Sequence, residues 1–318
     1  MILSMSFFVC ILYLVESRAD INIEVKVASN KGGTAVTSKG ADVKLVSDKE
    51  VKLYNITDYN LNRGLRIELG KAPDDIFLKD PTTYGNLFSK YKWKELHRKL
   101  YVKSAEIVDI VNENVELKSR NYINNTTRKV KIKVNLHEPV ETIISSFWDK
   151  NGFHDDIYYN ITIDHYKTKL IFENKWMDNN FKAKKSIFGM SNVGYINIAP
   201  GNTVTTKLTA KRTVILVKVV YTSTLIGSLV INYAHVYGKY HFYAPNISNI
   251  MKAAKLNNEI IINEAIEIKC YTDPVIDVID NTTGKKMPMI FIDKRFHQQK
   301  LKKSQLSIIN KKIFYKNF

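Results

Sequence analysis

The stretch from Gly194 to Tyr233 constrains the fold more than any other, because apolar and polar residues alternate along it with a period of two. From Thr203 to Ala210, apolar side chains alternate with threonine and lysine, which predicts a strand with one buried face. From Thr213 to Thr222 both faces are apolar, which is typical of an interior strand covered on both sides. Pro200-Gly201-Asn202 is a turn signal, and Gly227 predicts a bend. The stretch therefore predicts two to four adjacent antiparallel strands.

Runs with the same period recur along the chain, and their density favours an all-β protein. Further strands are expected at residues 21–27, 43–54, 65–69, 101–111, 115–117, 130–136, 140–148, 157–166, 170–176, 265–271 and 275–279. Residues 90–96 are expected to form a short strand or turn, and residues 177–185 a charged connector. One short helix is expected at residues 249–256, because Ser248 can cap it.

The first residues predict a signal peptide. The apolar run from Ile2 to Val15 is too short to cross a bilayer, and Ser17 and Ala19 form a small-x-small cleavage site. We expect residues 1–19 to be removed and the mature chain to be secreted and extracellular. No later stretch reaches the ~20 apolar residues that a membrane helix needs.

Sequons and cysteines accord with secretion. N-glycosylation sequons occur at Asn55, Asn124, Asn125, Asn160, Asn246 and Asn281. Two of them overlap, at Asn124 and Asn125, so we expect fewer than six occupied sites. Cys10 leaves with the signal peptide, and Cys270 then has no intramolecular partner. Cys270 is either a buried small apolar residue or an intermolecular link.

The chain is strongly basic, with a formal net charge of +17 and a pI of about 9.5. Such a charge indicates an acidic partner: anionic lipid, an acidic glycan or nucleic acid. The alternative is a lysine- and asparagine-rich composition that has no such partner. Secretion disfavours nucleic acid, so the expected partner is membrane lipid or an acidic glycan.

The C-terminal tail, Phe291–Phe318, concentrates this charge. It has eight Lys or Arg against one Asp, which gives +7. We expect a mobile arm or a weak amphipathic helix that contacts anionic surfaces. The expected contact residues are Lys294, Arg295, Lys300, Lys302, Lys303, Lys311, Lys312 and Lys316.

Motifs for enzymatic chemistry are missing from the sequence. The seven histidines form no HExxH, and there is no GxSxG, P-loop or GxGxxG. We therefore expect no enzyme, no catalytic residue, no cofactor and no metal. His154-Asp155-Asp156 could ligate a cation, but a solvated loop explains it better. His235 and His241 flank Tyr237–Tyr240, an aromatic patch that can bind sugars, stack on bases or simply pack on a sheet.

Several short segments occur in an order that is specific to one protein group. They are Asp74–Pro81, Tyr84–Phe88, Trp93, Asn124–Thr126, Glu138–Trp148, Ile198–Asn202, Leu208–Ala210, Val219–Tyr221, Asn232-Tyr233, His241-Phe242, Ala265–Ile268 and Tyr271. In order and spacing they resemble the spherulin 2A-like proteins, which include the insect follicular epithelium yolk proteins. That group resembles the aerolysin and epsilon-toxin type of β-pore-forming proteins. The resemblance implies an elongated, aerolysin-like antiparallel β architecture, with an N-terminal β domain at residues 20–118 and a membrane-module β domain at residues 119–290.

The same resemblance places a mobile, inserting hairpin at residues 138–164. Its extended arms are expected at residues 140–148 and 157–164, around a polar tip at Asn151-Gly152. The hairpin residues are Val140, Ile144, Phe147, Trp148, Ile157, Tyr159, Ile161 and Ile163. In a soluble monomer, Ile144, Phe147, Ile161 and Ile163 should pack on the body, because exposing apolar surface costs about 25 cal/mol per Å².

Two functions are consistent with this sequence. The first is a secreted aerolysin-like protein that binds membranes or forms homo-oligomers, including pores, as a venom or defence effector. The second is an egg or yolk storage glycoprotein of the same fold without pore activity. Ring formation and dye release from liposomes separate them, because the storage protein gives neither.

Overall fold

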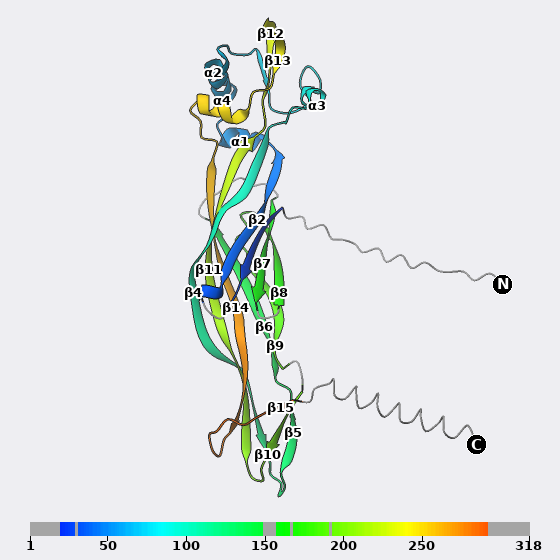
Figure 1. Cartoon of the computed structure of the whole chain (residues 1–318), viewed down its shortest axis with the longest axis vertical. Helices are drawn as coiled ribbons and strands as arrows, with labels where there is room; N and C mark the ends of the chain where they lie inside the picture. Colours follow the sequence, from blue (N-terminus) through cyan, green and yellow to red (C-terminus); the bar gives the residue numbers. More distant parts are fainter. Residues whose placement is uncertain (1–19, 29–30, 149–156, 166–167, 191–192, 292–318) are drawn as a thin grey trace, which may run out of the picture. The chain divides into compact units, whose positions relative to one another are not determined.

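The computed structural model describes residues 20–28, 31–148, 157–165, 168–190 and 193–291. The expected signal peptide, the hairpin tip with His154-Asp155-Asp156, and the tail residues from Lys294 to Lys316 lie outside these ranges. Most of the described residues are in strands, which confirms the all-β prediction (Figure 1).

The elements follow one another along the chain as long strands interspersed with short helices. The strands are β1 (Ile21–Lys26), β2 (Ala35–Leu45), β3 (Asp75–Phe77), β4 (His97–Ile123), β5 (Val130–Val134), β6 (His137–Trp148), β7 (Tyr158–His165), β8 (Thr168–Lys175), β9 (Lys182–Gly189), β10 (Gly194–Ile198), β11 (Thr203–Ile226), β12 (Val230–Tyr237), β13 (Tyr240–Tyr243), β14 (Ile260–Asp280) and β15 (Ile290–Phe291). The α-helices are α1 (Asp48–Leu53), α2 (Asp58–Leu69), α3 (Leu87–Tyr91) and α4 (Ile247–Ala253).

The strands form three sheets. The largest has the order β8-β7-β1-β2-β4-β11-β14-β6-β9, and the two smaller ones are β15-β10-β5 and β13-β12-β3. The chain divides into two compact units that interleave along the sequence. Unit 1 comprises Met1–Asp109, Ser145–Phe181 and Leu216–Glu267, and unit 2 comprises Ile110–Ile144, Lys182–Ile215 and Ile268–Phe318. The sequence instead placed a single boundary after residue 118.

The stretch from Gly194 to Tyr233 is extended as expected, but its strands are not neighbours. β10, β11 and β12 belong to three different sheets, so the prediction of adjacent strands is wrong. Residues 203–226 form one continuous strand, β11, between β4 and β14, which confirms the predicted interior strand. A strand of this length separates its own two ends, so the strands before and after it pair with different partners.

Of the strand expected at residues 43–54, only the first three residues are extended, in β2, and α1 occupies most of the rest. Helix α2 contradicts the strand expected at 65–69, and α3 extends to Tyr91, into the strand or turn expected at 90–96, of which Lys92 is a turn. Local signals nonetheless mark the helix ends. Ser47 and Glu50 form a capping box on α1, and Thr57 caps α2. Gly70 ends α2 in the left-handed conformation, with φ of 83°.

The one predicted helix exists but begins two residues early. α4 spans Ile247–Ala253, because Asn246 rather than Ser248 caps it: the Ser248 amide donates to Asn246 Oδ1 at 2.9 Å. The expected connector at residues 177–185 is also partly wrong, since β9 begins at Lys182.

The helices of unit 1 and the β12–β13 hairpin gather at one end of that unit (Figure 1). Helices α2 and α4 pack closely at Gly64, where a Cβ would lie 2.5 Å from the Ile250 carbonyl oxygen. Arg63 donates a hydrogen bond of 2.6 Å to the carbonyl of Ala254 at the end of α4. The apolar core beneath them includes Leu61, Leu65, Leu229, Ile231, Tyr233, Ile247, Ile250 and Met251.

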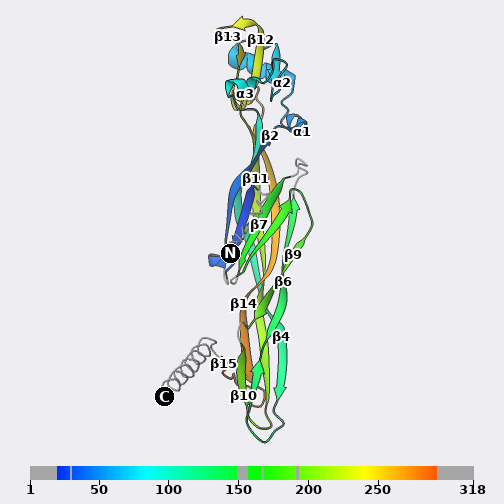
Figure 2. The ribbon, with the colours of Figure 1, turned by 90° about the vertical axis from the view of Figure 1, so that its right-hand side faces the viewer.

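The arms expected to form the mobile hairpin do not pair with each other. β6 pairs with β9 and adjoins β14, whereas β7 pairs with β8 and, in parallel, with β1 (Figure 2). The hairpin seen in the described residues is β7–β8, with a continuous register from Tyr158↔Lys175 to His165↔Thr168. The reason is that β1 offers β7 an apolar partner, since Ile21, Ile23 and Val25 are fully buried.

The expected packing of the two arms is correct with one exception. Ile144, Ile161 and Ile163 are buried, as are Val140, Ile157 and Tyr159, but Phe147 is 58% exposed. Trp148 is half-buried and stacks on Tyr221, with ring centroids 5.6 Å apart. The mobility of this segment stays a prediction.

Candidate functional site

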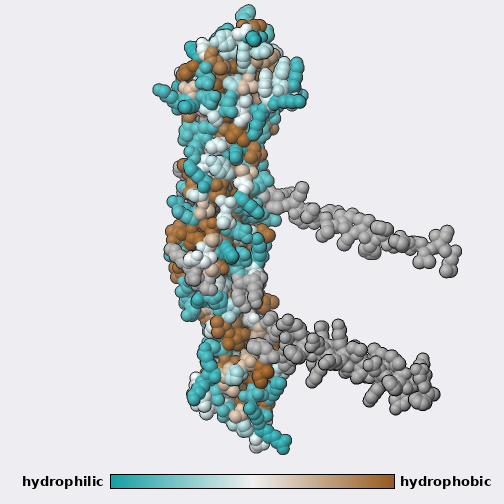
Figure 3. All heavy atoms as spheres, viewed as in Figure 1, coloured by the Kyte–Doolittle hydropathy of each residue, from teal (hydrophilic) through white to brown (hydrophobic). Residues whose placement is uncertain are grey.

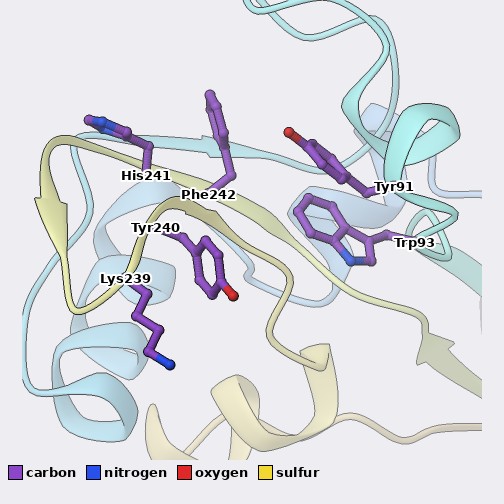
Figure 4. Close-up of a pocket in the computed structure, with 6 residues that line it drawn as sticks. All are labelled: Tyr91, Trp93, Lys239, Tyr240, His241 and Phe242. Carbon is purple, nitrogen blue, oxygen red and sulfur yellow. The ribbon is translucent and has the colours of Figure 1, made fainter.

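An open aromatic pocket of about 430 Å³ lies in unit 1 between α3 and the β12–β13 hairpin. Its lining residues are Tyr91, Trp93, Lys239, Tyr240, His241 and Phe242. Figure 4 shows two walls: Tyr91 and Trp93 form one, and Tyr240 and Phe242 form the other. We call this cavity the aromatic pocket.

The first wall depends on how α3 begins and ends. The Asp80 carboxylate accepts hydrogen bonds from the Ser89 amide at 2.9 Å and the Phe88 amide at 3.2 Å. Burial alone raises the pKa of Asp80, but these hydrogen bonds outweigh it and lower the pKa below its usual value. Lys92 then ends the helix with φ of 57°, which turns Trp93 back onto Tyr91. The two rings stack with centroids 4.6 Å apart.

The second wall belongs to the β12–β13 hairpin. Tyr240 and Phe242 both come from β13, and His241 between them points away from Tyr91 and Trp93 (Figure 4). His241 Nδ1 lies 2.9 Å from the carbonyl oxygen of Tyr233. Phe242 packs edge-on against Tyr84, whose hydroxyl donates to Asp75 Oδ2 at 3.0 Å. Phe242 is therefore held in place by Tyr84, whereas Tyr240 is 62% exposed.

The remaining aromatic residues of the patch are structural. Tyr233, Tyr237 and Tyr243 line a separate cavity with Leu69 and Gly238, and their rings contact one another. Tyr233 and Tyr237 donate hydrogen bonds to the carbonyls of Lys71 and Leu69, at 3.0 and 2.7 Å. The packing alternative from the sequence is confirmed for Tyr237, and ligand binding by this patch stays a prediction. Tyr237 packs on the body, and Tyr240 lines an open pocket.

Four lysines belong to the two segments that form the aromatic pocket. Lys90, Lys92 and Lys94 alternate with Tyr91 and Trp93 along the chain, and Lys239 comes from the opposite wall. We call these four residues the pocket-rim lysines. All four are exposed, and within the described residues none of them has a carboxylate within 4.0 Å. Lys90 Nζ lies 5.3 Å from the centroid of the Tyr91 ring.

This combination suits a sugar that carries an acidic group. Tyrosine and tryptophan rings stack on the apolar face of a sugar ring, and the hydroxyls of Tyr91 and Tyr240 can hydrogen-bond its rim. The pocket-rim lysines add positive charge for a sulfate or carboxylate. From the sequence, only the β12–β13 side of this pocket was predicted as an aromatic patch. The alternation of lysine with aromatic residues from Lys90 to Lys94 could have indicated the other side.

The structure separates the six glycosylation sequons into two groups. Asn124 is buried and donates through Nδ2 to the carbonyls of Arg128 and Ile198, both at 2.9 Å. Asn160 is buried on β7 and donates to Asn22 Oδ1 at 3.2 Å. A glycan on either residue conflicts with these contacts. The other four sequon residues, Asn55, Asn125, Asn246 and Asn281, are exposed.

Cys270 is fully buried in β14, and burial raises the pKa of its thiol to about 12. It is therefore the buried small apolar residue of the two expected alternatives. In the part of the chain that the structure describes, no three His, Cys, Asp or Glu side chains come together as metal ligands. The described helices include none that is long and apolar enough to span a membrane.

No family model matches this chain. It is similar to two proteins named as toxins, U-megalopygitoxin(8)-Mo12 of Megalopyge opercularis and U-megalopygitoxin(8)-Mc8 of Megalopyge crispata. The first is 26% identical over 255 residues, and the second is 25% identical over 254 residues. Each match covers 79% of this chain and 88% of the relative.

Two solved structures show a partial likeness to this chain. One is the parasporin-2 toxin of Bacillus thuringiensis, with a TM-score of 0.47 and 13% identity over 79% of this chain and 100% of that one. The other is the Mpp75Aa1.1 β-pore-forming protein of Brevibacillus laterosporus. Its TM-score is 0.39 and its identity 10%, over 77% of this chain and 94% of that one.

Proposed function

We propose that this chain is a secreted, toxin-like protein that attaches to target surfaces by binding an acidic glycan in the aromatic pocket. The toxin-like part of the proposal is supported by the names of its relatives and by the length of the matches, which extend over most of both chains. The observation that carries the glycan part is an aromatic pocket in which Tyr91 and Tyr240 are exposed, together with four exposed lysines that have no carboxylate within 4.0 Å among the described residues. A storage protein has no need of such a site.

Sugar binding tests the glycan part directly. A sulfated hexasaccharide and a neutral one of the same length are titrated against the full chain by calorimetry. Trp93→Ala removes one stacking ring and should weaken binding of both sugars about fivefold, because aromatic stacking contributes ~1 kcal/mol. Lys92→Gln with Lys94→Gln should weaken the sulfated sugar only. Tyr59→Ala is the matched control, since Tyr59 is 75% exposed and outside the pocket.

The finer part of the proposal is that the chain assembles on membranes and permeabilises them, and that the moving segment is β7–β8. Three features support this segment. It is a continuous hairpin, β8 ends the sheet order, and one six-residue ladder joins β7 to β1. Buried apolar residues such as Ile161 and Ile163 alternate along β7 and would face lipid in a barrel.

A reversible lock tests the moving segment. Asn22 and Asn160 touch across the β1–β7 pair, so Asn22→Cys with Asn160→Cys can form a disulfide between them. Dye release from liposomes should be blocked in the oxidised form and restored by reduction, and Cys270 does not interfere because it is buried. Equal release by both forms would show that β7–β8 is not the moving segment. A chain that binds the sulfated sugar but never permeabilises liposomes or forms rings would leave only the attachment function.

A further inference from the structure

Acidic residues are missing from two segments of the chain that meet in unit 2. Between Glu116 and Glu138 there are six Lys or Arg and no Asp or Glu, and no Asp or Glu occurs between Asp178 and Glu259. β5 comes from the first segment and β10 from the second, and the two strands pair antiparallel. The sheet that they form therefore carries basic residues without acidic neighbours on either strand.

Strand alternation sorts the side chains of this sheet onto two faces. One face is apolar, with Val134, Ile196 and Ile198 buried in the core of unit 2. The other face carries Lys131 and Lys133, which are exposed and lie opposite Asn197 and Tyr195 in the register. We call Lys131, Lys133, Tyr195 and Asn197 the β5–β10 outer face. Hydrophilic and hydrophobic residues are intermixed on the visible surface of this part of unit 2 (Figure 3).

Two more positive charges precede Lys131 in sequence. Arg128 and Lys129 are exposed, and the backbone at Arg128 is fixed, because Asn124 Nδ2 and Thr126 Oγ1 both donate to its carbonyl at 2.9 Å. Within the described residues, none of the four basic side chains has a carboxylate within 4.0 Å. Lys131 and Lys133 stand roughly 7 Å apart on one strand, so they repel each other without compensation.

Apolar and aromatic side chains lie among these charges. Tyr195 pairs with Lys133 on one side and with Ile290 of β15 on the other, so the three residues form one row across the sheet. Ile290 is 45% exposed, and Lys131 Nζ lies 4.6 Å from the centroid of the Tyr195 ring. Basic residues beside an exposed aliphatic side chain and a tyrosine match the boundary between headgroups and acyl chains. A sulfated sugar or a nucleic acid offers no acyl chain against which the exposed Ile290 side chain could be buried.

We propose that the β5–β10 outer face, together with Arg128 and Lys129, is a docking surface for anionic lipid headgroups. The lysines meet the phosphate and carboxylate groups, and Tyr195 and Ile290 enter the interface beside them. This contact is additional to the aromatic pocket and shares no residue with it. The expected tail sequence, with its charge of +7, follows β15 directly along the chain.

Flotation of the full chain with vesicles tests the proposal. The vesicles contain phosphatidylcholine alone or phosphatidylcholine with phosphatidylserine, at low and high salt. Lys131→Gln with Lys133→Gln should weaken binding to the phosphatidylserine vesicles by tenfold or more, since each basic residue contributes about fivefold. Lys131→Arg with Lys133→Arg should keep the binding. The tail is present in every variant, so its own contribution cancels in the comparison.

A matched control removes the same charge elsewhere. Lys49→Gln with Lys52→Gln changes two exposed lysines of α1 in unit 1 and should leave vesicle binding unchanged. Circular dichroism confirms that each variant is folded. Unchanged binding after Lys131→Gln with Lys133→Gln, or an equal loss in the α1 control, overturns the proposal. The sugar titration is independent of both outcomes, so failure of this surface is distinguishable from failure of the aromatic pocket.

Discussion

Replacing Glu264 by glutamine should change how the stability of unit 1 depends on pH. The Glu264 carboxylate in β14 is buried and accepts hydrogen bonds from the hydroxyls of Tyr159, at 2.5 Å, and Tyr221, at 2.6 Å. Trp148 and Trp176 pack around the same tyrosines. Within the described residues no lysine or arginine lies within 4.0 Å of this carboxylate. Burial therefore raises the pKa of Glu264, and the hydrogen bonds offset this only in part.

The magnitude follows from linkage. A carboxyl group whose pKa is raised in the folded state stabilises that state fully below the unfolded pKa and loses this contribution as pH rises through the folded pKa. Between these two pKa values, the free energy of unfolding of the wild-type chain should fall by up to about 1.4 kcal/mol per pH unit from this group alone. Glu264→Gln does not titrate. At low pH it should cost about 1 kcal/mol for one altered neutral hydrogen bond.

Urea denaturation at a series of pH values measures this effect. Tryptophan fluorescence follows unfolding at the site itself, because Trp148 and Trp176 pack around the tyrosines that bond to Glu264. The stability of Glu264→Gln relative to the wild type should rise with pH between the unfolded and the folded pKa of Glu264 and be constant outside that window, because all other titrating groups cancel in the difference. Glu68→Gln is the control, since Glu68 is exposed on α2. A difference between wild type and Glu264→Gln that does not vary with pH, or that changes in the opposite direction, refutes the reasoning.

Three further changes have definite expected outcomes. Glu50→Gln should lower the free energy of unfolding by about 3 kcal/mol in denaturation experiments, because it removes one of the carboxylates that pair with the fully buried Arg98 guanidinium. Gly227→Ala should lower it by about 2 kcal/mol or more, since φ is 108° and the new Cβ would lie 2.2 Å from the Glu95 carbonyl oxygen. Asn125→Gln should remove one glycan from the secreted chain, seen as a mass shift after deglycosylation.

Each of these three substitutions has a control substitution elsewhere in the chain. Glu259→Gln breaks the exposed pair with Lys103 and should cost at most about 1 kcal/mol. Gly201→Ala has a similar φ of 74° but no atom within 4 Å of the new Cβ, so it should cost less than Gly227→Ala. Asn124→Gln should leave the glycan number unchanged. Equal costs within either stability pair, or a lost glycan in Asn124→Gln, contradicts the structural explanation.

Strands whose partners lie close in sequence were predictable from the period of two. β7 and β8 form a local hairpin, and both were predicted within two residues of their ends. Sheet order was not predictable, because it depends on distant pairing. β1 joins β7 across more than a hundred residues, and nothing within either strand indicates a parallel partner.

The helices of unit 1 were missed for a different reason. Val51 and Leu53 fit the alternation of a strand, and a six-residue helix has too few turns for the helical period to show. The capping box of Ser47 and Glu50 did indicate a helix start, so a reading of caps before periodicity would have found α1.

The aromatic pocket shows the limit of sequence reasoning about sites. Trp93 and Tyr240 are separated by almost half the chain, and only the folding of unit 1 brings their walls together. The burial of Asn124 is a similar case. Its sequon looks the same as that of Asn125, but its side chain donates a hydrogen bond to the carbonyl of Ile198, which is far away in sequence.

The basic composition allowed two explanations. One is an acidic partner, and the other is a lysine- and asparagine-rich composition that serves no partner. The positions of the charges favour a partner. β11 lies in the stretch without acids, yet Lys207 pairs with Glu116 of β4, and Lys211 with Asp273 of β14. Neighbouring strands can therefore supply acids where the fold uses them. Among the residues that the structure describes, the pocket-rim lysines and the lysines of the β5–β10 outer face have no such partners, although pairing would relieve their repulsion. If partners outside the chain complete both sites, raising the salt concentration should weaken sugar and vesicle binding together, because exposed charges are screened.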